Sequence, residues 1–215
     1  KKGQSGVALI NVLEDGRNEV VAFAGINKNS KSKQVSNKEL EACSIVIGTM
    51  ELEEVETSDL FKRAKQKNCL TILNLAPYKA PSKLLLEQID ILVVNETEFL
   101  GLLNYAPQTV DIDFIDKNFS SLNIPSHVSV VITLGDSGVI AYANGKRKYF
   151  KSRKVKAIDT VGAGDCFVGA LGCSLSENPD IFSAVKFANC AASLSVTKKG
   201  AAKSMPSYDE VVNKL

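Results

Sequence analysis

The residues whose types and spacing most clearly suggest chemistry form one run, Asp159-Thr160-Val161-Gly162-Ala163-Gly164-Asp165. A strand-like stretch precedes the run and a helix-like stretch follows it, so the glycines stand where a helix begins. Glycine at positions 162 and 164 lets the backbone come close to a ligand. The free amide groups and the dipole at the amino end of a helix favour a negative charge there. The pattern therefore indicates a phosphate site.

Asp165 is the unusual member of this run, because a carboxylate repels a bound phosphate. One interpretation is structural: an acidic residue in the first turn interacts favourably with the helix dipole. The other is catalytic. Asp165 would take a proton from an attacking hydroxyl while the backbone amides stabilise charge on a phosphoryl group in transfer. The residues alone leave both interpretations open.

Several other function classes are excluded or disfavoured. The GxxxxGK[ST] pattern of P-loop proteins is absent, and the GxGxxG pattern of dinucleotide sites fails because position 167 is Phe. With 26 basic and 24 acidic residues the net charge is +2, which predicts neither a nucleic acid nor a membrane as a partner. No apolar stretch approaches the ~18 residues of a membrane-spanning helix.

The cysteines and the single histidine suggest no zinc site. Five cysteines contain no CxxC pair, and His127 is the only histidine. Free thiols are typical of a reducing compartment, so a cytoplasmic location is expected. Cys166, beside Asp165, is interpreted as a packing residue.

The elements that must position the phosphate site alternate along the chain. Apolar runs at 45–48, 70–75, 91–94 and 128–134 predict strands, and helix-like stretches at 58–67, 82–88, 96–103 and 111–122 lie between or beside them. Continuous apolar strands separated by helices are typical of βαβ units in a parallel sheet covered on both faces.

Two hairpins and a helical carboxyl-terminal third complete the prediction. Strands at 7–13 and 19–23 flank a turn-rich segment, and strands at 139–143 and 146–150 flank Asn144-Gly145, a strong hairpin signal. Lysines within 28–33 indicate a solvated loop. Helices are expected at 164–175, 183–196 and 208–215. We therefore expect one α/β domain over residues 1–215.

The run at 159–165 resembles the second hallmark motif of the ribokinase-like, or phosphofructokinase-B, carbohydrate kinases. Four more segments resemble motifs of that family in the expected order. Residues 95–98 resemble its NxxE motif, 133–138 its nucleotide-contacting T-L-G-x-x-G turn, and 196–201 its V-T-[RK]-x-G-A stretch. Residues 5–10 and 24–27 resemble the ribose-phosphorylating member more than its cousins. The resemblance implies a three-layer α/β/α fold with a mostly parallel central sheet, and a small β-hairpin lid to which residues 6–25 contribute.

The resemblance also implies roles at matching positions. Asp165 would be the catalytic base, and Gly162, Ala163 and Gly164 would form the anion hole. Glu98 would act on Mg²⁺ through water, because this ion keeps much of its hydration shell. The ATP site would include Asn95, Thr133, Leu134, Gly135, Asp136, Ser137, Gly138, Gly164 and Asn189. The K⁺ site would include Asp159, the Val161 carbonyl, Ser195, Lys198, Gly200 and Ser204. Ala8 and Glu51 would face the sugar.

The activity implied is ATP-dependent phosphorylation of D-ribose at its 5-hydroxyl, giving ribose 5-phosphate. The full-length protein would be a homodimer. The alternatives are a related kinase for fructose or a nucleoside such as adenosine, and a non-catalytic nucleotide-binding fragment. The family's first glycine-rich motif has no counterpart here, so we expect the N-terminal part to be missing from this chain.

Structural interpretations remain open for several of these residues. Asn95 and Glu98 have the spacing of a capping box at a helix start. Glu51 lies in an acidic run typical of an exposed surface, Asn189 would face solvent, and 133–138 would be an ordinary turn. Phe167 and Phe187 are expected in the core.

Overall fold

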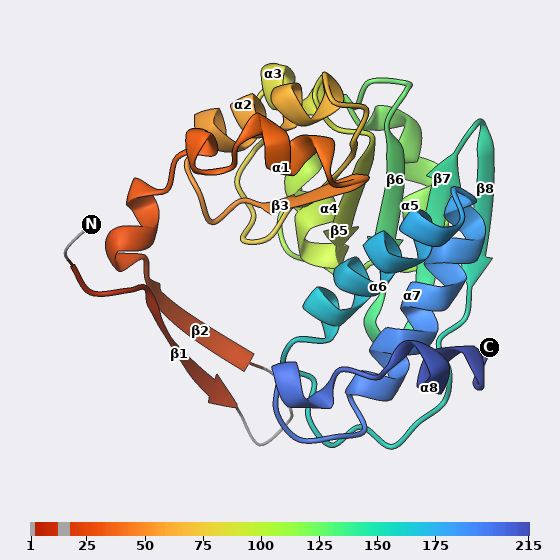
Figure 1. The fold of residues 1–215 in the computed structure, drawn as a ribbon. Coiled ribbons are helices and arrows are strands. Elements are labelled where there is room, and N and C mark those ends of the chain that lie inside the picture. The colour runs from red at the N-terminus through yellow and green to blue at the C-terminus, as the bar shows by residue number, and fades with distance from the viewer. Residues whose placement is uncertain (1–2, 13–17) are drawn as a thin grey trace.

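The computed structural model describes residues 3–12 and 18–215, and it contains two separate sheets (Figure 1). The smaller is an antiparallel pair, β1 (Val7–Val12) and β2 (Asn18–Phe23), in which Val7 lies opposite Phe23. This confirms the first predicted hairpin, except that positions 13–17 lie outside the described residues. Figure 1 shows the hairpin extending beside the main body.

The larger sheet has six strands in sequence order, β3 to β8. The first four strands are parallel, and β7 and β8 are added antiparallel at one edge. The predicted mostly parallel central sheet is therefore confirmed. The strands are β3 (Ile45–Thr49), β4 (Leu70–Asn74), β5 (Ile91–Asn95), β6 (Ser129–Thr133), β7 (Val139–Ala143) and β8 (Lys146–Phe150).

Helices cover both faces of this sheet. Successive side chains along a strand point to opposite faces, so each strand contributes apolar residues to both. Leu92 and Val94 pack on one face in a core that includes Phe61, and Ile91 and Val93 pack on the other. The first face is covered by α2 (Glu54–Lys65), α3 (Lys83–Leu86), α4 (Glu96–Leu102) and α5 (Ile112–Asn118), and the second by α6 (Ala163–Glu177) and α7 (Ile181–Ser195). Figure 1 shows α6 and α7 in front of the sheet. The three-layer α/β/α fold is confirmed.

The second hairpin follows the prediction closely. Asn144 and Gly145 have φ angles of 53° and 68°, so both central residues adopt the left-handed conformation that a tight two-residue hairpin turn requires. Asn and Gly are the residues that accept this conformation at least cost. The turn reverses the chain and starts β8, whose end leads into the segment before α6.

The structure differs from the prediction in the segment after the first hairpin. Residues 28–33 form parts of two 3₁₀ helices, η1 (Gly25–Asn29) and η2 (Ser32–Gln34), and a short helix α1 (Asn37–Glu41) follows. Ser32 is buried and donates a hydrogen bond to Asp59 at 2.6 Å, and Lys31 pairs with Glu56 at 2.8 Å. These contacts with α2 hold the segment in place, and such long-range contacts leave no periodic signal in the sequence.

Helix lengths also differ at some ends. The helix α2 begins at Glu54 rather than 58, and the stretch predicted at 111–122 divides into α5 and the 3₁₀ helix η3 (Phe119–Ser121). The last helix, α8 (Tyr208–Val212), is shorter than predicted, and further 3₁₀ turns are η4 (Gly135–Ser137) and η5 (Ala202–Ser204). Across the described part of the chain, no helix has both the length and the apolar character needed to cross a bilayer.

Candidate active site

The amino end of α6 carries the glycine-rich run. Gly162 occupies the N-cap position with φ of +80°, and no side chain caps the helix. A side chain at position 162 would place Cβ about 3.0 Å from the Cβ of Ala201, whereas a Cβ on Gly164 would meet nothing within 4 Å. The amide of Ala163 donates to the carbonyl of Thr160 at 3.2 Å, whereas the amides of Gly164 and Asp165 lack intrahelical partners by geometry. This end of α6 can therefore accept an anion, and the backbone at Gly164 is open to it.

A cavity of about 560 Å³ opens beside this helix end. Its volume lies within the ~300–1,000 Å³ of small-molecule sites. Its walls come from the turn after β6, the segment 151–157 after β8, the first turn of α6 and one side of α7. The site residues predicted from the sequence that line it are Thr133, Gly135, Asp136, Gly138, Ala163, Gly164 and Asn189.

The turn after β6 needs glycine for steric reasons. Gly138 has φ of +114°, and a Cβ there would lie 2.2 Å from the carbonyl oxygen of Phe150. The amide of Leu134 donates to the carbonyl of Gly138 at 2.8 Å, and the Leu134 side chain is buried under the turn. The Tyr149 hydroxyl donates to the carbonyl of the exposed residue Ser137. The turn is thus pinned against β8 and forms a defined wall.

Asn189 connects α7 to the segment after β8. Its side-chain amide donates to the carbonyl of Lys151 at 3.0 Å and to that of Phe150 at 3.4 Å. One turn further along α7, the hydroxyl of Ser193 lies 3.1 Å from that of Ser152. The half-buried Asn189 therefore positions a cavity wall, and does not simply face solvent.

Asp165 stands in the first turn of α6 with its side chain exposed. It lines a second, neighbouring cavity of about 400 Å³, together with Cys173, Phe187 and Tyr208.

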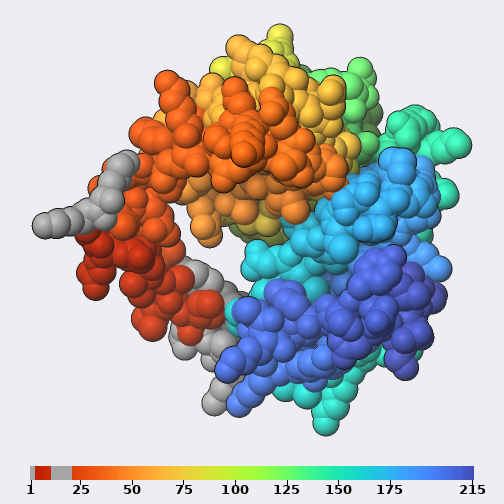
Figure 2. All heavy atoms as spheres, in the orientation of Figure 1, coloured from red at the N-terminus to blue at the C-terminus, as the bar shows by residue number. Residues whose placement is uncertain are grey.

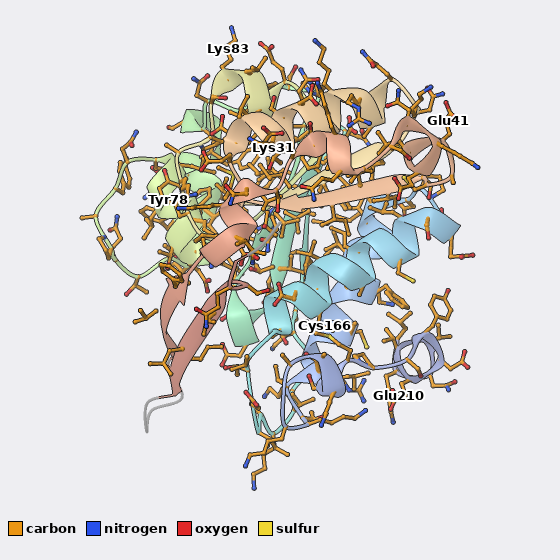
Figure 3. The ribbon with its side chains drawn as sticks, turned by 60° about the vertical axis from the view of Figure 1, so that its left-hand side comes forward. Lys31, Glu41, Tyr78, Lys83, Cys166 and Glu210 are labelled. Atoms are coloured by element: carbon orange, nitrogen blue, oxygen red, sulfur yellow. The ribbon has the colours of Figure 1, made fainter. Side chains whose placement is uncertain are left out.

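Figure 3 shows Cys166 at this end of α6, above the C-terminal segment that carries Glu210. Cys166 is buried, and burial raises the pKa of its thiol, as expected for a packing residue. Phe187 belongs to the same small core. Phe167, which lies in α6, packs in the core between α6 and the sheet and also lines the 560 Å³ cavity.

Asn95 and Glu98 are bonded to each other at the start of α4. The Asn95 side chain accepts from the Glu98 amide at 2.9 Å, and Glu98 accepts from the Asn95 amide at 2.8 Å and from its side chain at 3.2 Å. This is the capping box that the spacing allowed. Burial raises the pKa of Glu98, the Asn95 backbone amide opposes this rise, and Glu96 adds to it.

Glu96 is a candidate that the sequence analysis missed. Burial is the main cause that raises the pKa of its carboxyl, and the nearby Asp136 raises it further. Glu96, Glu98 and Asp136 thus gather negative charge at the carboxyl ends of β5 and β6. The signal was available, because position 96 lies inside the NxxE segment.

Asp159 joins the two loops predicted to hold a monovalent cation. One carboxylate oxygen accepts from the amide of Val161 at 3.0 Å and the other from that of Gly200 at 2.9 Å. The bond from Gly200 lowers the pKa of Asp159 most, and the bond from Val161 lowers it too. The charge of Lys199 lowers this pKa further. The hydroxyls of Ser195 and Ser204 donate to backbone carbonyls nearby on the chain, and both residues are buried.

The remaining predicted residues stand apart from the cavity. Ala8 lies in β1, and the exposed Glu51 follows the end of β3, where its amide donates to the Thr49 hydroxyl at 3.4 Å. Neither lines the 560 Å³ cavity. Figure 2 shows a hollow between the hairpin and the main body.

Lys198, predicted for the cation site, directs its ammonium to Glu210 at 3.0 Å.

The segment 151–157 is a cavity wall that the sequence analysis did not identify. Lys151, Arg153 and Lys154 all line the cavity, and Arg153 also donates to the carbonyl of Lys214 at 3.0 Å. The basic run Lys-Ser-Arg-Lys at 151–154 was visible in the sequence. Its position beside α7 depends on the bonds from Asn189.

Comparison with known proteins relates this arrangement to a family. Residues 1–208 match the family described as pfkB family carbohydrate kinase. The curated ribokinase of Staphylococcus aureus (strain COL) is 34% identical over 215 residues, which cover 98% of this chain and 69% of that protein.

Solved structures show the same fold. Ribokinase from Cryptococcus neoformans var. grubii in complex with ADP superposes with a TM-score of 0.86 at 25% identity, covering 100% of this chain and 73% of that chain. Arabidopsis thaliana ribokinase, complexed with ribose and ATP, gives 0.84 at 26% identity, covering 97% of this chain and 68% of that chain.

The bonds of Asp159 predict a pH-dependent contribution to stability. Because its pKa is lowered in the folded chain, the ionised carboxylate stabilises the fold above its unfolded pKa, and the contribution is lost as pH falls through the folded pKa. We expect Asp159→Asn to lower the urea midpoint at neutral pH, and the difference from the parent to shrink towards about pH 3. Asp113→Asn, at an exposed site, is the control. A difference that stays constant across this range would contradict the assignment.

Proposed function

The chain belongs to the pfkB family of carbohydrate kinases, and from this membership we propose that it phosphorylates D-ribose at its 5-hydroxyl with ATP, giving ribose 5-phosphate. One observation carries the proposal: a nucleotide-sized cavity opens onto the uncapped amino end of α6, and Asp165 stands in the same turn. The ribokinases among its relatives, one solved with ribose and ATP, support ribose as the acceptor.

Asp165 serves as the base in this proposal. Its carboxylate takes the proton of the sugar hydroxyl as the oxygen attacks the terminal phosphorus of ATP. Its exposed side chain leaves it accessible to a sugar on the outer side of α6. The backbone of Gly162, Ala163 and Gly164 would form the anion hole, where fixed amides stabilise charge on the transferring group. The open backbone at Gly164 is its most available part, because the Ala163 amide donates to the carbonyl of Thr160.

The ATP site follows the cavity. The turn 133–138 and the Asn189 side of α7 form its walls, and Gly164 marks the phosphate end. Lys151 and Lys154 add positive charge to its lining, which suits a polyphosphate. Asn95, at the carboxyl end of β5, lies beside Thr133 in the strand register and holds its place through the capping box.

The acidic residues at the ends of β5 and β6 would act on a hard divalent cation through water, because no three such side chains in the described part of the chain lie close enough together to hold the ion directly. Glu96, Glu98 and Asp136 offer carboxylate oxygens, the ligands that Mg²⁺ prefers, and Glu98 would act through water because both its oxygens already accept bonds from Asn95. When bound with ATP, Mg²⁺ supplies neutralisation of phosphate charge.

The loops around Asp159 suit K⁺, because the atoms that could coordinate the ion there are all oxygens. The ionised Asp159 carboxylate keeps lone pairs beyond those used by two amides, and the Val161 carbonyl and the hydroxyls of Ser195 and Ser204 complete the candidate set. Gly200 and Lys198 would contribute through the backbone, since the Lys198 ammonium pairs with Glu210. A cation here would tie the loop before α6 to the loop after α7.

The hairpin supports a homodimer for the whole natural protein. Its cross-strand pairs Val7–Phe23 and Leu9–Val21 share one face, and all four side chains are at least 60% exposed. A contiguous apolar face of this kind favours burial against another protein surface.

The five free cysteines support a cytoplasmic location.

The role of Asp165 is tested by Asp165→Asn in the whole natural protein. An amide cannot accept the proton, so ribose-dependent ADP release should fall by ~10²–10⁴-fold or more. MgATP binding, measured by titration calorimetry, should be almost unchanged. Asp113→Asn should behave as the parent does. A near-normal rate in Asp165→Asn would remove Asp165 as the base, and loss of ATP binding would assign it a nucleotide-binding role instead.

The cation site predicts dependence on K⁺. Ribose-dependent turnover should be high in KCl and low in NaCl at equal ionic strength, because Na⁺ is too small for loops that hold K⁺. Asp159→Asn should reduce the response to K⁺ more than Asp113→Asn does. Equal rates in the two salts would argue against a K⁺ site.

The hairpin face predicts that Leu9→Lys converts a dimer of the whole protein to a monomer in sedimentation velocity, because the lysine would place a charge within the buried interface. Leu84→Lys, at another exposed apolar position in α3, is the matched control and should stay dimeric. A monomeric parent, or a Leu9→Lys variant that stays dimeric, would be inconsistent with pairing through this face.

A further inference from the structure

Two cysteines meet at the amino end of the main sheet, away from the candidate active site. Cys43 precedes β3 and Cys69 immediately precedes β4, the parallel neighbour of β3. Their sulfur atoms are 3.7 Å apart. The amide of Leu70 donates to the carbonyl of Ser44 at 2.8 Å, so the two backbones are already joined at this point.

The two thiols differ in accessibility. Cys43 is exposed in the short connection between α1 and β3, whereas Cys69 is only 4% exposed and packs with Leu40 and Ala64. The Cys69 thiol donates to the carbonyls of Leu40 at 3.1 Å and Cys43 at 3.2 Å. A solute can therefore reach Cys43 first, with Cys69 directly behind it. An accessible thiol beside a second, resolving thiol is the arrangement of redox-sensitive cysteine pairs.

We propose that Cys43 and Cys69 are a reversible oxidation site, which closes to an intrachain disulfide when the protein meets a hydroperoxide. The Cys43 thiol first releases its proton to solvent. Its thiolate attacks the peroxide, so that an S–O bond forms to give the sulfenic acid and the O–O bond breaks, and the departing alkoxide or hydroxide takes a proton from solvent to become an alcohol or water. The Cys69 sulfur then attacks the Cys43 sulfur and loses its proton, the S–O bond breaks, and the departing hydroxide takes that proton to become water. Two thiols are oxidised by two electrons and one peroxide is reduced.

The local geometry allows this closure. The sulfur atoms must approach from 3.7 Å to the ~2.0 Å of a disulfide. Cys43 is exposed in the connection between α1 and β3, so its side chain is not packed into the core, while the buried Cys69 is held where β4 starts. Burial, and then the contact with Cys43, raise the pKa of Cys69 to about 11. This shift agrees with Cys69 as the second thiol to react, because the first attack requires a thiolate.

Neighbouring contacts already hold the two segments together. Lys67 pairs with Glu41 at 2.5 Å, so an ion pair joins the end of α1 to the segment before β4 beside the thiols. Figure 3 shows Glu41 at the outer edge of the molecule. A disulfide here would close a loop between residues 26 positions apart, enclosing β3 and α2. Closing such a loop restricts the unfolded chain and raises stability.

The site is separate from the phosphate chemistry. Cys43 and Cys69 precede the amino ends of β3 and β4, whereas Asn95 and Thr133 stand at the carboxyl ends of β5 and β6. Oxidation is therefore expected to lock the β3 edge of the sheet without altering the nucleotide cavity.

The test is to treat the protein with hydrogen peroxide, block the remaining thiols and map the peptides by mass spectrometry. A peptide that links Cys43 to Cys69, and that a dithiol reductant releases, is expected. Cys43→Ser should give no linked peptide and leave Cys69 as a thiol. Cys173→Ser, which removes another exposed cysteine, should form the link as the parent does.

A second measurement separates the bridge from damage to the fold. The oxidised parent should melt on the order of 5–10 °C higher than the reduced protein, with unchanged MgATP binding, and Cys43→Ser should show no such rise. Cys43 recovered unmodified, as sulfinic acid without a link, or joined to another cysteine would overturn the proposal. A Cys43–Cys69 link without a rise in melting temperature would overturn its stabilising role.

Discussion

The carboxylate of Asp159 holds together the two loops that meet beside the amino end of α6. It accepts the amide of Val161 within its own loop and that of Gly200 from a loop 41 residues further along the chain. Next to it, the amide of Ile158 donates to the carbonyl of Val196 at 2.7 Å. These bonds decide where α6 begins relative to the end of α7, and Gly162 then directs the chain into the helix, which no side chain caps. Every role proposed for that helix end depends on this join.

The two kinds of strand pairing in the main sheet contribute different parts of the site. The parallel strands bring Asn95 and Thr133 to one edge, because parallel strands end on the same side. The antiparallel strands β7 and β8 instead return the chain to that edge, so that residues after Phe150 run along α7. Asn189 binds the carbonyls of Phe150 and Lys151 and keeps this segment in place. A cavity results between elements that are distant in the sequence.

Local signals in the sequence predicted much of the fold correctly. The apolar runs that predicted β4, β5 and β6 are buried between two helical layers, the run at 45–48 forms the partly buried strand β3, and Asn144-Gly145 forms the expected turn. The spacing of Asn95 and Glu98 allowed both a capping box and a site role, and the structure shows the capping box. Elements held by long-range contacts were missed. The 3₁₀ helix η2 is an example, since its position depends on Ser32 and Lys31 contacting α2.

The sequence by itself determined the order of strands and helices, the turns that need glycine or asparagine, and the glycine-rich start of α6. Each of these depends on neighbouring residues, so composition and spacing carry the information. Only the tertiary structure decided that residues 151–157 form a cavity wall, that Glu96 lies beside Asp136, and that Cys43 faces Cys69. These pairings join segments far apart along the chain. Their geometry depends on sheet register and helix packing, which no local pattern specifies.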